Sequence, residues 1–242
     1  MKLNKLIFSF TIILIISSIS LYSKNIEEIV VTGTKGKTQI INETGNLSLI
    51  SNEEINFISP DNPSNVLNRM PGVFISQGSG QEHLTSIRSP VLSGGAGAGS
   101  FLYLEDGIPL RSPGFSNVNG LMESNIEISE RTEVIRGPGS VLYGSNAVHG
   151  LVNVITEKEN ADYNNKLNIR AGKNKIFLNS STYRELENSN LLFNFLWKED
   201  NGYTNNYTEQ NSDKFDKPHY GQQKFLIRLN AERNSKNYIF LL

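Results

Sequence analysis

The chain has 242 residues, a net charge of −1, 38% hydrophobic residues and no cysteine. The near-neutral charge gives no general basis for binding nucleic acid, and the lack of cysteine excludes disulfides, thiolate metal sites and cysteine nucleophiles. The three histidines, His83, His149 and His219, are widely separated and do not form a metal-ligand motif, so we expect no metal and no cofactor.

The first residues have the composition of a secretory signal peptide. Lys2 and Lys5 precede an apolar run, Leu6 to Ile16, and several serines follow it. We expect a signal peptide at 1–23, cleaved after Ser20 or Ser23. The alternative is an uncleaved anchor helix, but such a helix needs about 20 apolar residues. No cysteine follows for lipid attachment, and the chain is therefore predicted to be exported into a bacterial envelope.

The next segment, residues 24–44, is a polar leader with one β-prone island from Ile26 to Gly33. Gly36 and a mixture of Lys, Thr, Gln and Asn follow the island, which argues against a packed element. An extended apolar island on a flexible tether can pair with the exposed sheet edge of a partner. It could equally be the first strand of the following domain, and composition leaves both interpretations open.

Residues 45–158 predict a compact α+β unit with a mixed sheet and short helices. Helices are expected to begin near Ser51 and at Asn62-Pro63, because both positions carry helix-start residues. Short strands are expected at 47–50, 73–75, 84–88, 101–105 and 108–110. Two loops, 93–100 and 112–120, are expected to be mobile apices. The glycines of the first loop lack the Gly-Lys-Ser/Thr ending of a phosphate loop.

The stretch from Ile126 to Lys158 is expected to close this unit. Its first part reads as a strand that starts at Ile126 and carries charges at positions 127, 130, 131, 133 and 136. Gly137-Pro138-Gly139 stops this strand, and 151–156 fits a buried strand because it is rich in β-branched residues. A charged strand beside a buried one suggests a domain enclosed by another structure that pairs its charges.

After residue 158 the pattern changes to strands of roughly ten residues with alternating apolar and polar positions. These strands are expected at 167–171, 176–184, 191–198 and 225–232, and another begins at 238. Strands with one apolar face are typical of an outer-membrane barrel. A soluble antiparallel sheet with one wet face is the alternative, but the export signal favours the barrel. We therefore expect the first antiparallel strands of a transmembrane β-barrel.

Four stretches of the chain resemble the TonB-dependent outer-membrane receptors. The leader residues that resemble the TonB box of that family are Glu28, Ile29, Val30, Val31 and Thr32. Asn65–Val73 resembles the helix end of the family's plug domain, and Tyr103–Leu110 resembles a plug hairpin. The best match is Arg131–Pro138, followed by Leu142–Ala147 and Gly150. One departure is Thr132, which stands where the family usually has an apolar residue.

The resemblance implies a signal peptide (1–23), a leader with the TonB box (24–44), a plug domain (45–158) and the first strands of an incomplete barrel (159–242). In this family the plug fills a barrel of about 22 strands in outer-membrane lipid. The implied partners are TonB, with the inner-membrane ExbB/ExbD motor, and a small extracellular ligand. The plug and the TonB box would be reachable from the periplasm of a diderm bacterium.

The resemblance also implies functional residues within the plug. Arg88 and Arg136 stand where plug arginines of the family pair with barrel glutamates, and Glu133 is expected to join these plug–barrel ionic contacts. Local capping or solvation at a strand edge is the alternative interpretation of the arginines. The residues expected at the ligand-facing apices are Gly94, Gly95, Gly97, Phe115 and Asn117.

The function implied is energy-coupled uptake of a scarce ligand, such as an iron-siderophore, haem or cobalamin. Residues 159–242 suffice for four strands and the start of a fifth, so we expect an N-terminal fragment of such a receptor. The alternative is an exported plug-only or pseudogene product that binds ligand or TonB without transport. An enzyme is not expected, because Ser145 and His149 have no acidic partner or oxyanion loop nearby in sequence.

Overall fold

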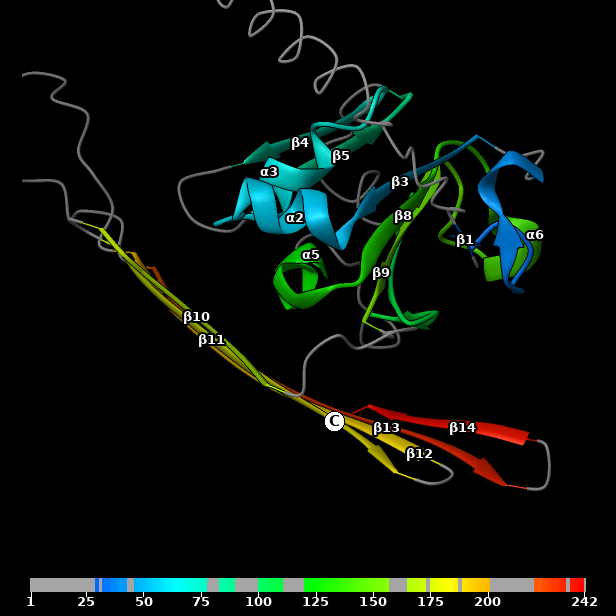
Figure 1. The fold of residues 1–242 in the computed structure, drawn as a ribbon. Helices are drawn as coiled ribbons and strands as arrows, with labels where there is room; N and C mark the ends of the chain where they lie inside the picture. Colours follow the sequence, from blue (N-terminus) through cyan, green and yellow to red (C-terminus); the bar gives the residue numbers. More distant parts are fainter. Residues whose placement is uncertain are drawn as a thin grey trace, which may run out of the picture.

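The fold was analysed in a computed structural model of the chain. The structure describes residues 29–30, 32–42, 46–77, 83–89, 100–110, 120–156, 165–172, 175–186, 189–200, 220–233 and 236–241. The predicted signal peptide lies outside the described residues. Within them, an α+β domain sits on one side of a separate, curved antiparallel sheet, which we call the wall sheet (Figure 1).

The α+β domain contains a five-stranded mixed sheet in the order β3-β8-β9-β6-β7 and two small hairpins, β1-β2 and β4-β5. Its strands are β1 Ile29–Val30, β2 Thr38–Gln39, β3 Leu47–Ser51, β4 Val73–Gln77, β5 His83–Ile87, β6 Phe101–Glu105, β7 Ile108–Pro109, β8 Arg131–Ile135 and β9 Gly150–Ile155. Strand β9 runs parallel to β6 and antiparallel to β8. The mixed sheet predicted from the sequence is confirmed.

Short helices connect these strands. They are η1 Ile40–Asn42, α2 Asn52–Ile58, α3 Pro63–Leu67, α5 Gly120–Glu123, η2 Ile126–Ile128 and α6 Ser140–Tyr143. The Ser51 side chain caps α2 by accepting from the Glu54 amide. Asn62 caps α3 within a capping box, and Pro63 takes the first turn, where its missing N–H costs little. Both predicted helix starts are therefore observed.

Two apolar clusters hold the α+β domain together. The larger packs the helices against one face of the mixed sheet, and it includes Ile55, Leu67 and Val134. The smaller packs Ala147 beside Leu102 and Leu151, next to α6. Both clusters are built from residues of this domain alone. The domain therefore has a core of its own.

One element differs from the sequence prediction. The charged strand was expected to start at Ile126, but residues 126–128 form the 3₁₀ turn η2, and β8 begins only at Arg131. The Ile128 amide donates to the Asn125 carbonyl, and Asn125 is itself held by the Glu105 carboxylate. This tertiary hydrogen bond favours a turn where the local residue pattern predicted a strand.

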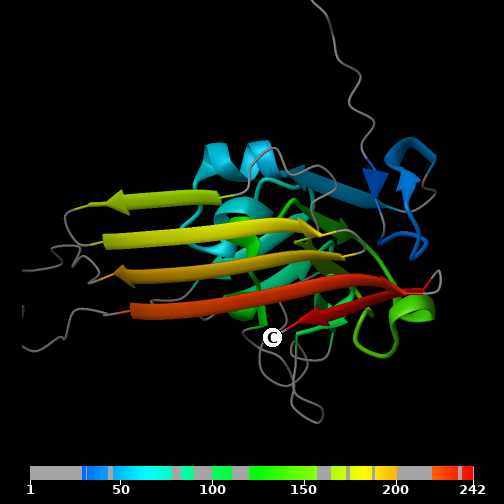
Figure 2. The same cartoon turned by 60° about the horizontal axis from the view of Figure 1, so that its bottom comes forward.

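The wall sheet has the order β10-β11-β12-β13-β14, with antiparallel neighbours throughout. Its strands are β10 Asn165–Ala171, β11 Lys175–Leu186, β12 Ser189–Asp200, β13 Tyr220–Arg233 and β14 Lys236–Leu241. Figure 2 shows β10 to β13 side by side across one side of the α+β domain. The predicted series of antiparallel strands is confirmed.

The two faces of the wall sheet differ. Leu192, Leu196 and Leu226 point toward the α+β domain and are buried, whereas Phe225 and Leu167 on the other face are 60% and 63% exposed. This alternation is the one that the sequence predicted for a sheet with an apolar outer face. Among the described residues, no helix is long and apolar enough to cross a membrane.

Candidate functional site: the leader contact and the plug–wall seam

The leader is held by polar groups of the mixed sheet and of α6. Thr32 is fully buried: its amide donates to the Glu133 carboxylate at 2.8 Å, and its carbonyl accepts from the Tyr143 hydroxyl at 2.9 Å. Its hydroxyl accepts from the Asn153 side chain at 3.0 Å. Just before it, Val30 is buried and pairs with Thr38 in the β1-β2 hairpin. The end of the predicted TonB box is thus docked on the domain.

The electrostatics of this contact are those of a buried site. The Arg131 guanidinium donates to the other Glu133 oxygen at 2.7 Å, so Glu133 is shared between Arg131 and Thr32. Burial raises the pKa of Tyr143 to about 12, and the nearby Glu133 charge adds to this effect. Tyr143 therefore remains a neutral donor to the Thr32 carbonyl at any physiological pH.

The predicted TonB box is only partly covered by the structure. Glu28 and Val31 lie outside the described residues, and Ile29 is placed only as part of β1. The hairpin favours the interpretation of the island as a paired strand in this state. Its predicted pairing with TonB stays a prediction.

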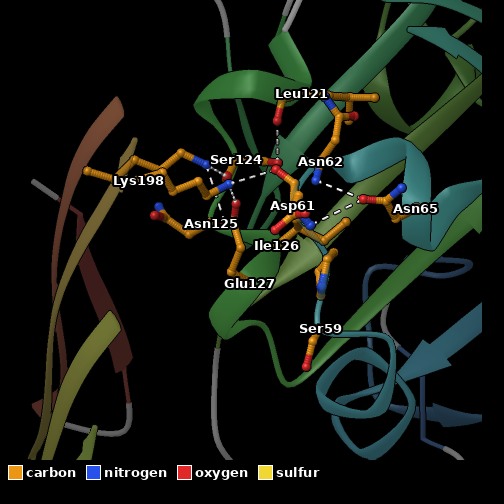
Figure 3. Close-up of polar contacts among 12 residues, drawn as sticks. Ser59, Asp61, Asn62, Asn65, Leu121, Ser124, Asn125, Ile126, Glu127 and Lys198 are labelled. Atoms are coloured by element: carbon orange, nitrogen blue, oxygen red, sulfur yellow. Dashed lines mark hydrogen bonds and ion pairs between the residues drawn. The ribbon is translucent and has the colours of Figure 1, made fainter. Parts of the chain in front are cut away.

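A second site lies where the α+β domain meets the wall sheet. The Glu127 carboxylate of η2 contacts the Lys198 ammonium of β12 through one oxygen, and the Lys224 ammonium of β13 lies 3.3 Å from the other. All three side chains are at least nine-tenths buried. Lys224 also donates to the Ser124 carbonyl at 2.5 Å. Figure 3 shows Lys198 reaching from the wall toward Glu127 and Asp61.

Asp61 forms one edge of this contact. Its carboxylate lies 3.2 Å from the Lys175 ammonium and 3.7 Å from the Arg170 guanidinium, and its carbonyl accepts from Lys198 at 3.3 Å. The Asp61 side chain is 54% exposed, so solvent screens these pairs and each is worth about 0–1 kcal/mol. Lys166 of β10 donates to Asn56 at 2.9 Å beside it.

Asp106 forms a third contact, in the turn between β6 and β7. Its carboxylate accepts from the Thr156 amide at 2.9 Å and lies 3.5 Å from the Arg228 guanidinium of β13. Both side chains are almost fully buried. Asp106 has a positive φ of 48°, which this turn position requires and which Asp tolerates better than most residues.

We call these contacts of Glu127, Asp61 and Asp106 with basic wall residues the plug–wall seam. Apolar contacts add to the seam: Ile128 lies in one cluster with three wall residues, Tyr183, Leu192 and Leu226. The seam has one polarity: the α+β domain supplies the carboxylates and the wall supplies the cations.

Burial and charge act differently on the two carboxylates near the seam. Burial alone would raise the pKa of Glu127, but the two ammonium groups outweigh it and lower the pKa to about 2. Burial raises the pKa of Glu105, and the hydrogen bonds from Asn125 offset this only in part. Glu127 is therefore firmly ionised, whereas Glu105 is pushed toward its neutral form.

The three residues predicted for plug–barrel ionic contacts lie elsewhere. Glu133 has the interior contacts described above, and Arg136 donates to the Pro71 carbonyl at 2.9 Å. Arg88 has a positive φ of 49°, and its side chain packs beside Gly72. The contacts described for these residues are with the α+β domain, and their pairing with barrel residues stays a prediction. All five predicted apex residues lie outside the described residues.

Sequence reasoning therefore missed the seam. A sequence signal for the seam was present on the wall strands: basic residues recur on the face opposite the outward apolar residues. These are Lys166, Arg170, Lys198, Lys224 and Arg228. Five inward cations require carboxylates on the enclosed domain. No group of three or more His, Asp or Glu side chains that could hold a metal ion occurs within the part that the structure describes.

Comparison with known proteins agrees with this geometry. The family model of the TonB-dependent Receptor Plug Domain matches residues 39–151. The vitamin B12 transporter BtuB of Vibrio vulnificus (strain CMCP6) is 31% identical over 169 residues, which cover 69% of this chain and 27% of that protein.

Solved structures share the fold at lower identity. The pyoverdine outer membrane receptor FpvA from Pseudomonas aeruginosa PAO1 matches with a TM-score of 0.66 and 17% identity, over 88% of this chain and 29% of that one. The ferric-catecholate import receptor Fiu from E. coli K12 matches with a TM-score of 0.56 and 17% identity, over 84% and 28%.

The residues matched by the family model therefore include most of the α+β domain, which is a plug domain. The chain belongs to the TonB-dependent receptors, as the sequence motifs predicted. It spans about a quarter of the length of the curated relative that it matches. The domain boundaries proposed from the sequence stay predictions.

Proposed function

We propose that this chain acts in the energy-coupled uptake of a scarce ligand across the outer membrane of a diderm bacterium. The observation that carries the proposal is the docked leader: Thr32 is tied into the plug sheet through Glu133, Tyr143 and Asn153. A pull on the leader would therefore reach the domain that contacts the wall through η2 and the β6-β7 turn. This connection suits a protein in which force on a tether loosens a plug.

The proposed partner of the leader is periplasmic TonB, powered by ExbB/ExbD. Ile29 and Val30 are extended and pair through their backbone in β1-β2, so the same backbone could pair with an added partner strand. The proposed ligand is an iron-siderophore, cobalamin or a similar compound. Support for this ligand class comes from the names of the similar proteins: a vitamin B12 transporter, a ferric-catecholate import receptor and a pyoverdine outer membrane receptor.

Substitution at Val30 tests the leader. Val30→Pro removes a backbone donor from the strand, so binding of the chain to the periplasmic domain of TonB should weaken at least about tenfold. Val30→Ile keeps the donor and the β-branched shape, and it should bind like the parent chain. Affinity is measured by titration of purified proteins. Equal binding by the Pro variant would remove the strand-addition proposal.

Uptake is measured separately. Cells that express the protein should take up ferric siderophore or cobalamin saturably, and uptake should be lost in a TonB-deficient strain and with Val30→Pro. TonB binding without any uptake would instead support the binding-only alternative.

A further inference from the structure

The seam contains one contact that joins the plug to two wall strands at once. Glu127 faces Lys198 on β12 and Lys224 on β13, and these strands are direct neighbours in the wall sheet. The apolar cluster around Ile128, the next residue, screens this contact from water. The other acidic residues of the seam are less suited to hold the plug on the wall, because Asp61 is half-exposed and Asp106 contacts a single wall cation, Arg228.

We propose that Glu127 is the residue that holds the plug on the wall, and that its contact with Lys198 and Lys224 has to open before the plug can leave. In this contact the carboxylate belongs to the plug and the cations belong to the wall, whereas the pairs expected from the sequence for Arg88 and Arg136 have the cation on the plug and stay a prediction. The proposal rests on the proposed function only in treating the plug as a displaceable domain.

Removal of Glu127 would leave buried charges of the wall without compensation. Without Glu127, two buried ammonium groups would face the plug with no carboxylate between them. An uncompensated buried charge is far more costly than a lost surface pair. The closed state would then lose stability relative to a state in which the plug is withdrawn and water reaches both lysines. Retention of the plug should therefore depend on this carboxylate more than on any exposed pair of the seam.

The chain offers a clean way to measure plug displacement, because it has no cysteine. Ser124→Cys places a thiol at a fully buried position whose carbonyl contacts Lys224, so its labelling by a maleimide reports separation from the wall. Thr132→Cys places a thiol at a fully buried position in β8, an interior strand of the mixed sheet, so its labelling reports unfolding of the plug itself. Labelling follows the population of the open state when closing is fast.

In the whole chain in detergent micelles, Glu127→Gln should speed labelling at the Ser124→Cys site at least about 100-fold. Labelling at the Thr132→Cys site should change much less. A matched control lies in an exposed contact: Asp61→Asn removes a carboxylate from the same seam. It should change Ser124→Cys labelling by less than about fivefold.

The wall side gives an independent measurement if Glu127→Gln does not fold. Lys198→Met should also speed labelling at the Ser124→Cys site, and Glu127→Gln added to it should have a smaller effect than alone, because both changes break one contact. Parent-like labelling with Glu127→Gln or with Lys198→Met, or equal acceleration at both thiol sites, would overturn the proposal. The assay uses no ligand and no TonB, so failure of uptake would leave it intact.

Discussion

At the scale of single residues, two buried carboxylates show how surroundings decide charge. Glu127 is 8% exposed and lies between two ammonium groups, whereas Glu105 is 4% exposed and accepts hydrogen bonds from the backbone and side-chain amides of Asn125. Amide donors offset the cost of burial only partly, whereas two cations exceed it. The pKa is therefore lowered for Glu127 and raised for Glu105.

These opposite shifts predict opposite pH dependences of stability. For Glu127, the pKa falls from 4.5 in the unfolded chain to about 2 in the folded chain. Its contribution is complete above pH 4.5 and is lost as the pH falls toward 2. For Glu105, the raised pKa means that ionisation opposes folding, so its penalty is absent in acid and develops as the pH rises above 4.5.

Two variants separate these effects. Glu127→Gln should flatten the loss of stability between pH 4.5 and 2, and Glu105→Gln should instead remove a penalty that is present at pH 7. The measurement is the free energy of unfolding from urea titrations at a series of pH values. Equal slopes for both variants and the parent would contradict the assignment of these charges.

At the scale of elements, strand β9 depends on a close approach of its neighbour. Gly150 begins β9, and a Cβ atom there would lie 2.8 Å from the Ile135 carbonyl of β8 and 3.0 Å from the Ile87 side chain. Gly139 is also tight, but the contact at 2.9 Å is with the end of the Leu151 side chain, which can rotate away. Backbone cannot yield in this way without disturbing the sheet.

Gly150→Ala should therefore destabilise the plug by about 1–3 kcal/mol, the usual cost of overpacking. Gly139→Ala is the matched control and should cost less, because a side chain can move. Urea unfolding, followed by circular dichroism, gives both values. A smaller loss for Gly150→Ala than for Gly139→Ala would show that β8 and β9 can separate locally.

Elements that depend on nearby residues could be predicted from the sequence. The caps at Ser51 and Asn62 lie within three residues of their partners, and the strands of the wall follow from alternation. The 3₁₀ turn η2 could not be predicted, because it depends on Glu105, 20 residues away from Asn125. The contacts of Glu127 with Lys198 and Lys224 join residues that are 71 and 97 positions apart in the sequence, and only the folded chain brings them together.

At the scale of the whole molecule, the plug has two apolar cores of its own and shares a third cluster with the wall. The first two are complete within one domain. The seam and the third cluster are therefore the features that bind the two parts together. Removing the wall should leave the plug folded. It should also bring the pKa of Glu127 back toward its usual value, because Lys198 and Lys224 belong to the wall.

An excised plug, residues 24–158, therefore provides the last prediction. In the whole chain Glu127→Gln should weaken the attachment of the plug to the wall by about 3–5 kcal/mol, because two buried lysines of the wall lose their partner. In the excised plug the same change should cost less than about 0.5 kcal/mol, because Glu127 then faces water. Hydrogen exchange of the amides at residues 124–128, which lie at the seam, measures the first change, and urea unfolding of the excised plug measures the second.

Glu133→Gln is the matched control, because the Arg131 and Thr32 contacts of Glu133 belong to the plug in both proteins. It should destabilise the excised plug and the whole chain to a similar extent. Should Glu127→Gln destabilise both proteins equally, the role of Glu127 would be internal to the plug, and the wall would have to be held by Asp106 and the apolar cluster around Ile128. The comparison thus decides whether the plug and its wall are joined mainly by charge or by packing.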